Sequence, residues 1–186
     1  MTTAPEGITI RLARPGDAPA IEALDGSFTT PTVFEAAATD AGFTLREVPV
    51  DPPLRKSFPP EEHDEQEIGE DNEADHRTFV ALDGEGLCGF AAVAYAPWNR
   101  RLTVEDIEVA PGHRGRGIGR ALMERAAGFG RERGARHLWL EVSSVNAPAV
   151  HAYRRMGFAL CGLDTTLYDG TPAAGEQALY MARPLH

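Results

Sequence analysis

The order of patterns in the second half of the chain restricts the fold more than any other feature of the sequence. Alternating apolar residues at 102–109 predict a β-strand, and a glycine-rich turn separates it from a helix expected over 117–133. Branched residues at 137–142 predict another strand, and a helix expected over 146–156 follows it. Preceded by several strands, this alternation is typical of a mixed α/β fold around one sheet.

The first half of the chain carries shorter patterns that predict strands joined by turns. Residues 26–42 are weakly patterned and are expected to form a loop and a short helix. A strand at 43–50 should end at Pro49, Pro52 and Pro53, because proline cannot donate to a strand ladder. The other elements expected are strands at 8–12, 77–82, 87–95, 158–168 and 176–181, and a helix at 15–24.

The length and charge of the chain limit what it binds. Its 186 residues suffice for one hydrophobic core and are too few for two ordinary domains, so a single domain, 1–186, is expected. The formal net charge of −10 argues against nucleic acid as a partner, since phosphate contacts need Lys and Arg, and favours the approach of cations. Residues 61–75 hold nine acidic side chains and no Lys or Arg, and this acidic loop is expected to be solvated.

The sequence also argues against a membrane anchor and a metal site. No apolar run approaches about 18 residues and the N-terminus lacks a signal-peptide pattern, so a cytoplasmic location without membrane contact is expected. Cys88 and Cys161 lie in apolar stretches and are expected to be buried packing residues. His113 and His151 lack metal-ligand spacing with other His or Cys residues, so no metal is expected.

The strongest local motif is the turn Arg114-Gly115-Arg116-Gly117-Ile118-Gly119, between the strand and the long helix. Glycines bring N–H groups close to a ligand, and the helix start adds unpaired N–H groups and the positive end of its dipole. The turn therefore predicts a pyrophosphate site, to which Arg114, Arg116 and Arg120 add charge. One alternative is an ordinary tight turn before a packed helix. Another is a dinucleotide site with Glu141 on the ribose, although Arg120 stands where that fingerprint needs its third glycine.

Together with a second segment, this turn resembles the signature of the GNAT superfamily of N-acetyltransferases. The superfamily has Arg/Gln-x-x-Gly-x-Gly/Ala in the pyrophosphate loop and Asn-x-x-Ala-x-x-x-Tyr-x-x-x-Gly-Phe downstream. The matching residues here are Arg114, Gly117 and Gly119, then Asn146, Ala149, Tyr153, Gly157 and Phe158. The resemblance implies an acyl-CoA N-acyltransferase fold, with a central, mostly antiparallel sheet flanked by helices, and acetyl-CoA as co-substrate.

The chain also looks like the streptothricin (nourseothricin) N-acetyltransferases along essentially its whole length. The similarity extends outside the superfamily motifs, through stretches such as EALDGSFTTPTVF, WNRRLTVEDIEVAP and LCGLDTTLYDGT. It implies that a small cationic, aminoglycoside-like antibiotic (streptothricin) is inactivated by acetylation of an amine of its β-lysine moiety, through direct attack of that amine on the thioester. Because dimers are common in the superfamily, the resemblance favours a homodimer.

The resemblance also assigns residues to the cofactor. Pantetheine is expected beside the end of the strand at 102–109, and Tyr153 matches the family's general acid, whose phenol, with a pKa of about 10, donates well to a thiolate. The alternative for Tyr153 is an aromatic ring packed in the core, and the alternative for Asn146 is a helix N-cap alone. The residues implied for cofactor binding are Ile107, Val109, Arg114, Gly115, Arg116, Gly117, Ile118, Gly119, Arg120 and Asn146.

The carboxylates of Glu105-Asp106-Ile107-Glu108 need a reason, because they lie in a strand expected to be largely buried and burying unpaired charge is costly. Glu105 and Asp106 are expected to hold the ammonium of the substrate, and one of them to pass its proton to water. A bulge, common in the family at this place, would change the face that each side chain takes. The alternative is a salt bridge to Arg100 or Arg101.

Two further residues are candidates for contact with the substrate. Trp98 could form a platform for a flat cation, with core packing as the alternative. Glu141, at the end of the strand at 137–142, is a candidate for holding the cationic substrate. Two other functions stay open. One is an acetyltransferase acting on a protein amine. The other is a non-catalytic acyl-CoA sensor or antibiotic-sequestering module, which would need neither Tyr153 nor the strand carboxylates.

Overall fold

The computed structural model describes residues 4–57 and 75–186, which divide into two compact units. The first unit comprises the described residues of Met1–Ser27, Ser57–Trp139 and Pro184–His186, and the second comprises Phe28–Lys56 and Leu140–Arg183. The acidic loop expected at 61–75 lies, except for Asp75, outside the described residues. None of the helices in the described part is long and apolar enough to cross a membrane.

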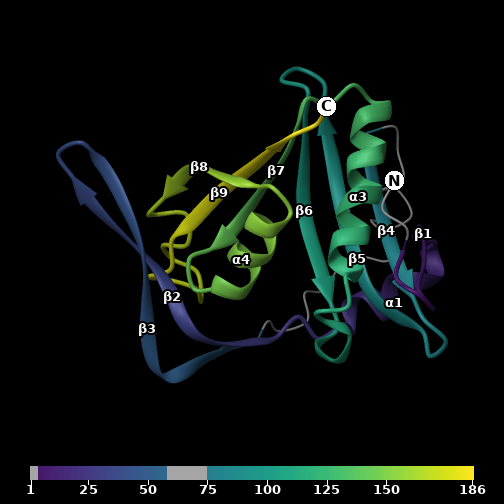
Figure 1. Ribbon diagram of the computed structural model, residues 1–186, viewed down its shortest axis with the longest axis horizontal. Helices are drawn as coiled ribbons and strands as arrows, with labels where there is room; N and C mark the ends of the chain where they lie inside the picture. Colours follow the sequence, from purple (N-terminus) through teal and green to yellow (C-terminus); the bar gives the residue numbers. More distant parts are fainter. Residues whose placement is uncertain (1–3, 58–74) are drawn as a thin grey trace. The chain divides into compact units, whose positions relative to one another are not determined.

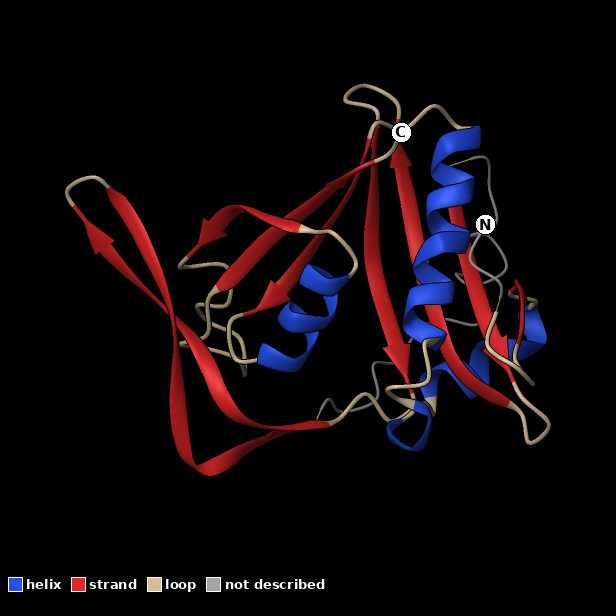
Figure 2. Cartoon of the chain, in the orientation of Figure 1, coloured by secondary structure: helices blue, strands red, loops and turns tan. Residues whose placement is uncertain are grey.

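Four strands of the first unit form an antiparallel sheet in the order β1-β4-β5-β6. The long helix α3 packs along β4, β5 and β6 (Figure 2). A cluster of buried residues, Ala13, Ile21, Val80 and Phe90, packs the short helix α1 near the sheet. The bounds are β1 (Thr9–Leu12), η1 (Pro15–Asp17), α1 (Ala18–Glu22), β4 (His76–Leu82), β5 (Leu87–Ala96), β6 (Arg101–Val109), η2 (Pro111–His113) and α3 (Ile118–Glu132).

The apolar face of α3 holds the helix on the sheet. Ile118 and Leu122 recur at helical spacing and are almost fully buried. At Gly130 a Cβ atom would lie 3.1 Å from Cδ2 of Leu102, so glycine allows the helix to approach the sheet closely. Gly134 takes a left-handed conformation, with φ of 75°, directly after the helix, as expected for its C-terminal glycine.

Strand β6 contains the bulge that the family resemblance implied. Val104 pairs with Val93 and Asp106 pairs with Ala92, so Glu105 is an extra residue without a partner in the ladder. Because side chains alternate along a strand, the extra residue moves Asp106 to the face opposite Val104. Val104 is buried, whereas Glu105 and Asp106 are exposed, so the bulge is the reason that this strand carries carboxylates without burying them.

The second unit combines a small sheet, one helix and a long hairpin. Its sheet has the order β7-β9-β8, and β7 crosses the boundary between the units in the sequence. The hairpin of β2 and β3 is drawn in blue in Figure 1, and β2 contacts α4. Buried Phe34 belongs to β2, and its N–H donates to the Ser144 carbonyl at 2.8 Å. The bounds are β2 (Phe28–Thr39), β3 (Gly42–Lys56), β7 (His137–Ser143), α4 (Ala147–Arg155), β8 (Ala159–Asp164) and β9 (Ala178–Pro184).

The hairpin corrects two expectations from the sequence. The loop and short helix expected at 26–42 are wrong, because β2 occupies most of that range and pairs with β3 at every residue except Pro31. The far half of β2 is exposed and is held by its hydrogen bonds to β3. It therefore has no buried apolar face, which is the pattern that predicts a strand from sequence. The prolines do not end β3: Pro49 pairs with Thr32, whereas Pro52 and Pro53 lie where the ladder is already irregular.

Two smaller expectations also need correction. The strand expected at 158–168 ends at Asp164, whose carboxylate accepts hydrogen bonds from the backbone N–H and hydroxyl of Thr166 and so turns the chain out of the sheet. Cys161 is exposed, whereas Cys88 is buried as expected. The other strands and helices expected from the sequence are confirmed within one to three residues at each end.

Candidate functional site

The glycine turn has the backbone geometry of an anion site. Gly115 and Gly117 have φ of 77° and 86°, in the left-handed region that favours glycine. Gly117 is the N-cap of α3 and, as a glycine, has no side chain that could cap the helix, so it does not cover the first N–H groups of the helix. Gly119 has room for a Cβ, whose nearest neighbour would be Cγ2 of Val109 at 3.7 Å. The two left-handed glycines, and not Gly119, are therefore required by the turn itself.

The side chain of Arg114 holds the glycine turn to a distant loop. Its Nε donates to the Val109 carbonyl at 2.8 Å, and its Nη1 and Nη2 donate to the carbonyls of Ser27 and Asp25 at 2.6 and 3.4 Å. The guanidinium that the sequence analysis expected to add charge is thus committed to main-chain oxygens. Arg116 and Arg120 are exposed and remain the arginines of the turn that are expected to face an anion.

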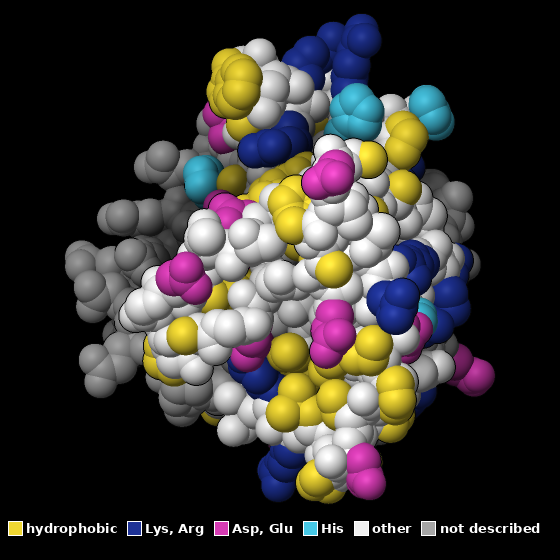
Figure 3. All heavy atoms as spheres, turned by 90° about the vertical axis from the view of Figure 1, so that its left-hand side faces the viewer, with side chains coloured by type: hydrophobic (Ala, Val, Ile, Leu, Met, Phe, Trp, Pro, Cys, Tyr) yellow, Lys and Arg dark blue, Asp and Glu magenta, His cyan; other side chains and the backbone are white. Residues whose placement is uncertain are grey.

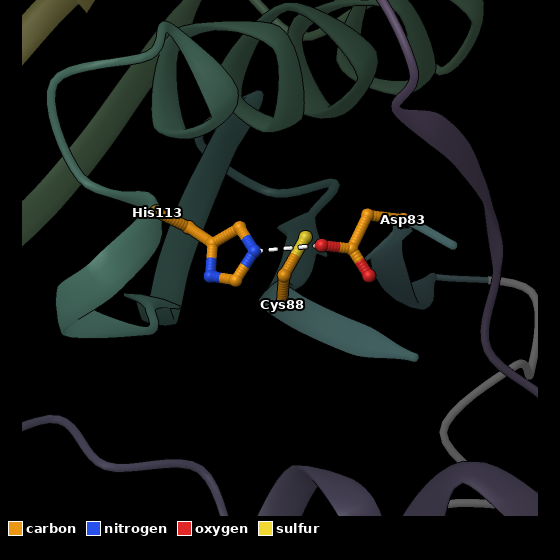
Figure 4. Close-up of side chains that lie close together, drawn as sticks. All are labelled: Asp83, Cys88 and His113. Carbon is orange, nitrogen blue, oxygen red and sulfur yellow. Dashed lines mark hydrogen bonds and ion pairs between the residues drawn. The ribbon is translucent and has the colours of Figure 1, made fainter. Parts of the chain in front are cut away.

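A second contact fixes the start of the glycine turn (Figure 4). His113 Nε2 lies 2.7 Å from Asp83 Oδ2, while Asp83 Oδ1 accepts from the N–H groups of Glu85 and Gly86 at 2.8 and 3.0 Å. The N–H of Glu85 first, and then His113, lower the pKa of the Asp83 carboxyl. The pair therefore ties the residue before Arg114 to the turn between β4 and β5.

Cys88 lies beside this pair, and the three ligand atoms lie within 4.8 Å of one another. The thiol is buried and donates to the Ala81 carbonyl at 3.4 Å. Burial raises the pKa of Cys88, which keeps it a neutral thiol. Protein hydrogen bonds thus already engage the side chains of Asp83, Cys88 and His113.

The carboxylates of β6 have separate surroundings. The Glu105 carboxylate lies 3.9 Å from Nδ1 of His76, and both side chains are about half exposed. Glu108 packs against the loop that Arg114 holds: a Cβ atom at Gly26 would lie 2.2 Å from Oε1 of Glu108. Gly26 therefore allows the 25–27 main chain to pass over this carboxylate.

The residues offered as alternatives around β6 have other neighbours. Arg100 donates from Nε to the Gly134 carbonyl at 2.9 Å, and the Arg101 guanidinium lies 4.4 Å from the centroid of the Trp139 ring. Trp98 is 86% exposed on the turn between β5 and β6, so core packing, the alternative for this residue, is wrong. That Trp98 forms a platform for a flat cation stays a prediction.

In the second unit, α4 carries Asn146 and Tyr153 at its two ends. Oδ1 of Asn146 accepts from the N–H of Ala149 at 3.2 Å, which confirms it as the N-cap of the helix. Tyr153 is partly exposed, and its ring centroid lies 5.8 Å from that of Phe158. Contact of Asn146 with pantetheine and proton donation by Tyr153 stay predictions.

Glu141 has a partner that the sequence analysis missed. The Tyr168 hydroxyl donates a hydrogen bond to Oε1 of Glu141. The negative charge of Glu176 lies close enough to affect the pKa of Glu141. Burial raises the pKa of the Glu141 carboxyl, the Tyr168 hydrogen bond opposes that rise, and the Glu176 charge adds to it. Tyr168 was expected at the end of a strand, where nothing in the sequence pattern connects it with Glu141.

Comparison with known proteins assigns the chain to a protein family. Residues 44–158, more than half of the chain, match the model described as the Acetyltransferase (GNAT) family. The chain belongs to the GNAT family of acetyltransferases. It has the fold of that family, a mostly antiparallel sheet flanked by helices, and it is an acetyl-CoA-dependent acetyltransferase.

Relatives of this acetyltransferase resemble it over nearly its whole length. It is 68% identical over 176 residues to a streptothricin acetyltransferase of Streptomyces lavendulae, covering 94% of this chain and 93% of the relative. A crystal structure of nourseothricin acetyltransferase superposes with a TM-score of 0.89 at 65% identity, covering 97% of this chain and 99% of that one. A putative streptothricin acetyltransferase of Bacillus anthracis, in complex with acetyl coenzyme A, has the same fold, with a TM-score of 0.81 at 24% identity and coverage of 96% and 99%.

The glycine turn of this acetyltransferase has features that an anion site needs, and its binding of the pyrophosphate of acetyl-CoA stays a prediction. Gly115 and Gly117 expose main-chain N–H groups, and the N-terminus of the fifteen-residue helix α3 lies directly behind them. Arg116 and Arg120 supply positive charge at the surface of the turn. The N–H groups at the start of the helix and the two arginines both suit a group with two negative charges.

Proposed function

We propose that this acetyltransferase acetylates an amine of the β-lysine moiety of streptothricin-class antibiotics and thereby inactivates them. The observation that carries the proposal is the 68% identity to the Streptomyces lavendulae enzyme over 94% of the chain. Because the match covers 94% of the chain, it extends well beyond the pyrophosphate turn. Substrate selection depends on such regions, because every member of the family shares the cofactor.

Charge supports a cationic substrate, and its distribution matters. The net charge of the chain is −10, and the segment 61–75, with nine acids and no Lys or Arg, supplies nearly all of it. On the face drawn in Figure 3, the described acidic side chains are scattered among apolar and uncharged atoms, with separate basic side chains beside them. Within the described residues, we expect the exposed carboxylates of Glu105 and Asp106 to attract the cation.

The residues divide the reaction among them. The N–H groups of the glycine turn bind the pyrophosphate, and the main chain at Ile107 and Val109 aligns the pantetheine. Glu105 and Asp106 hold the substrate by its ammonium. The amine nitrogen, once neutral, bonds to the thioester carbonyl carbon as the carbon–sulfur bond breaks, and the Tyr153 hydroxyl donates its proton to the departing sulfur. The proton that the nitrogen loses as it becomes an amide restores the Tyr153 hydroxyl.

Acetylation explains inactivation in simple terms. The product carries a neutral amide where the antibiotic had an ammonium, so one positive charge is lost and the nitrogen becomes bulkier. An antibiotic that uses that cation to bind its target loses affinity for it. Expression of the protein in a sensitive bacterium should therefore confer resistance.

Mass spectrometry of streptothricin after incubation with purified protein and acetyl-CoA tests the proposal. We expect one added acetyl group, with fragment ions that place it on the β-lysine moiety. A lysine-rich peptide under the same conditions serves as the comparison. An unmodified antibiotic together with an acetylated peptide would reject streptothricin as the substrate and favour a protein amine.

A further inference from the structure

We propose that His113 and Asp83 are positioning residues for the cofactor, and that their contact holds the start of the glycine turn in the conformation that binds acetyl-CoA. The inference rests on the proposed function in one respect, because it requires the pyrophosphate to bind at residues 114–119. It does not depend on which amine is the substrate. Neither side chain needs to touch the reacting atoms, so both act through the main chain of the turn.

Asp83 is a fixed anchor in the tight turn between β4 and β5. Its Oδ1 accepts from the N–H groups of Glu85 and Gly86 at 2.8 and 3.0 Å, and its own N–H donates to the Gly86 carbonyl at 2.9 Å. These bonds engage Oδ1 and leave Oδ2 to contact Nε2 of His113 at 2.7 Å (Figure 4). The direction of the carboxylate is therefore set within its own turn, and it can hold a partner in place.

The hydrogen shared by the pair belongs to His113. The N–H of Glu85 first, and then His113, lower the pKa of Asp83, so its carboxyl is ionised at neutral pH and can only accept hydrogen bonds. Nε2 of His113 must therefore be the donor. A hydrogen bond to a charged acceptor is stronger than one between neutral groups. The two side chains are only 23% and 17% exposed, so water competes with this bond to a limited extent.

The buried thiol of Cys88 lies beside the pair without competing for it. The thiol donates to the Ala81 carbonyl at 3.4 Å. Burial first, and then the negative charge of Asp83, raise the pKa of Cys88 and keep the thiol neutral. Within the part of the chain that the structure describes, His113 therefore supplies the side-chain hydrogen bond that Asp83 accepts.

His113 passes this anchorage to the glycine turn through the main chain. It is the last residue of η2, its N–H donates to the Ala110 carbonyl at 2.8 Å, and the next residue, Arg114, begins the turn. Arg114 is held separately, by the carbonyls of Val109 and Ser27. Two adjacent residues thus fix the start of the turn through side-chain contacts that do not share a partner.

Preorganisation of the turn is what the pair can contribute to binding. Glycine has wide backbone freedom, and the N–H groups at Gly115 and Gly117 bind an anion only in the conformation that directs them toward it. The affinity of a ligand falls in proportion to the fraction of the protein that has the competent conformation. Loss of the pair should therefore raise the Kd and KM for acetyl-CoA and leave kcat at saturating cofactor unchanged.

His113→Leu and His113→Gln are a matched pair of variants, because glutamine is of similar size and keeps an N–H donor for Asp83. Calorimetric titration should show acetyl-CoA affinity roughly 3- to 30-fold weaker for the leucine variant and within about twofold of the wild type for the glutamine variant. Both should keep kcat and the KM for the amine within about twofold. His137→Leu, at an exposed histidine of β7, is the control and should bind acetyl-CoA normally.

A merely structural histidine would give a different result. His113→Leu would then lose thermal stability or kcat while its acetyl-CoA affinity stayed at the wild-type value, and that outcome would overturn the positioning role. Equal weakening of affinity in the leucine and glutamine variants would overturn the role of the hydrogen bond.

A double-mutant cycle tests whether the two residues act as a pair. Asp83→Ser keeps a side-chain oxygen that can accept from the N–H groups of its turn but is too short to reach His113. It should weaken acetyl-CoA binding by about the same factor as His113→Leu, and the double variant should bind no worse than either single variant. Effects that multiply in the double variant would overturn the pairing.

Gly117→Asp separates this inference from the proposed function. If that variant binds acetyl-CoA normally, the glycine turn is not the pyrophosphate site and both are wrong. If Gly117→Asp abolishes binding while folded His113→Leu keeps the wild-type affinity, only the positioning role is wrong. Circular dichroism and thermal melting establish that each variant is folded.

Discussion

The guanidinium of Arg114 is bonded to the main chain of Ser27, 87 positions earlier in the sequence, with 2.6 Å between Nη1 and the carbonyl oxygen. The same side chain also reaches the carbonyls of Asp25 and Val109. Arg114 therefore links the loop after α1, the end of β6 and the start of the glycine turn. The family signature includes this arginine in the pyrophosphate loop. In the structure its side chain bonds to main-chain carbonyls and so holds the loop in place.

Arg114→Ala should destabilise the protein and weaken acetyl-CoA binding together. Loss of a hydrogen bond of this kind costs about 0.5–1.5 kcal/mol, so loss of the two shorter bonds, to Val109 and Ser27, should lower the free energy of unfolding by about 1–3 kcal/mol. Urea denaturation and calorimetric titration with acetyl-CoA measure the two effects. Arg46→Ala, at an exposed arginine of the hairpin, should change neither quantity. Normal stability with weakened binding would instead indicate direct contact of Arg114 with the cofactor.

Gly117→Asp should abolish acetyl-CoA binding, because it places a carboxylate where we propose that the phosphates bind. The left-handed φ of 86° also strains any side chain, so Gly117→Asn separates the two causes: asparagine has the same size, tolerates that conformation and carries no charge. We expect affinity in the order wild type, Asn, Asp by isothermal titration. Gly128→Ala, with no atom within 4 Å of the added Cβ, is the control that should bind normally. Equal affinity for the Asn and Asp variants would contradict an anion site at this turn.

Tyr153→Phe should lower turnover by roughly 10²- to 10⁴-fold, the usual contribution of a general acid. The ring is kept, so its contact with Phe158 and the affinity for acetyl-CoA should stay unchanged. Release of free CoA under saturating substrates measures turnover, and calorimetry measures affinity. Near-normal turnover in this variant would make Tyr153 a packing residue of α4.

Asp83 should make the protein sensitive to acid. Its pKa is lowered in the folded protein from 3.8, so its carboxylate stabilises the fold at pH above about 4, and that contribution is lost as pH falls through the lower folded value. Unfolding by urea at several pH values should show a steeper acid loss for the wild type than for Asp83→Asn. Asp169→Asn, at an exposed aspartate, should follow the wild type. Parallel acid curves for wild type and Asp83→Asn would show that the pKa of Asp83 is not lowered in the folded protein in solution.

The sequence predicted elements that carry their own apolar face or local stop signals. Helix α3 is an example, because Ile118 and Leu122 mark its buried side and Gly134 ends it. Strand β2 escaped prediction because its far half is held by backbone bonds to β3, which no residue pattern records.

The same distinction applies to the site. The glycine turn and Asn146 were predictable, since each depends on residues a few positions apart. The partners of Arg114 and Glu141 were not, because Ser27 and Tyr168 meet them only through the folded chain. Sequence periodicity reports local conformation, and these contacts are tertiary.

The unpaired position of Glu105 also bears on how β6 tolerates a change in length. Its neighbours in the ladder, the Val93–Val104 and Ala92–Asp106 pairs, are consecutive on β5. A chain without residue 105 would join them into an unbroken ladder, with every later side chain on the face it now occupies. Deleting one residue from a strand between two others normally turns the following residues inside out. Here the ladder with β5 could lose Glu105 and keep its register, so the fold does not require this residue, and its proposed role is in binding the substrate.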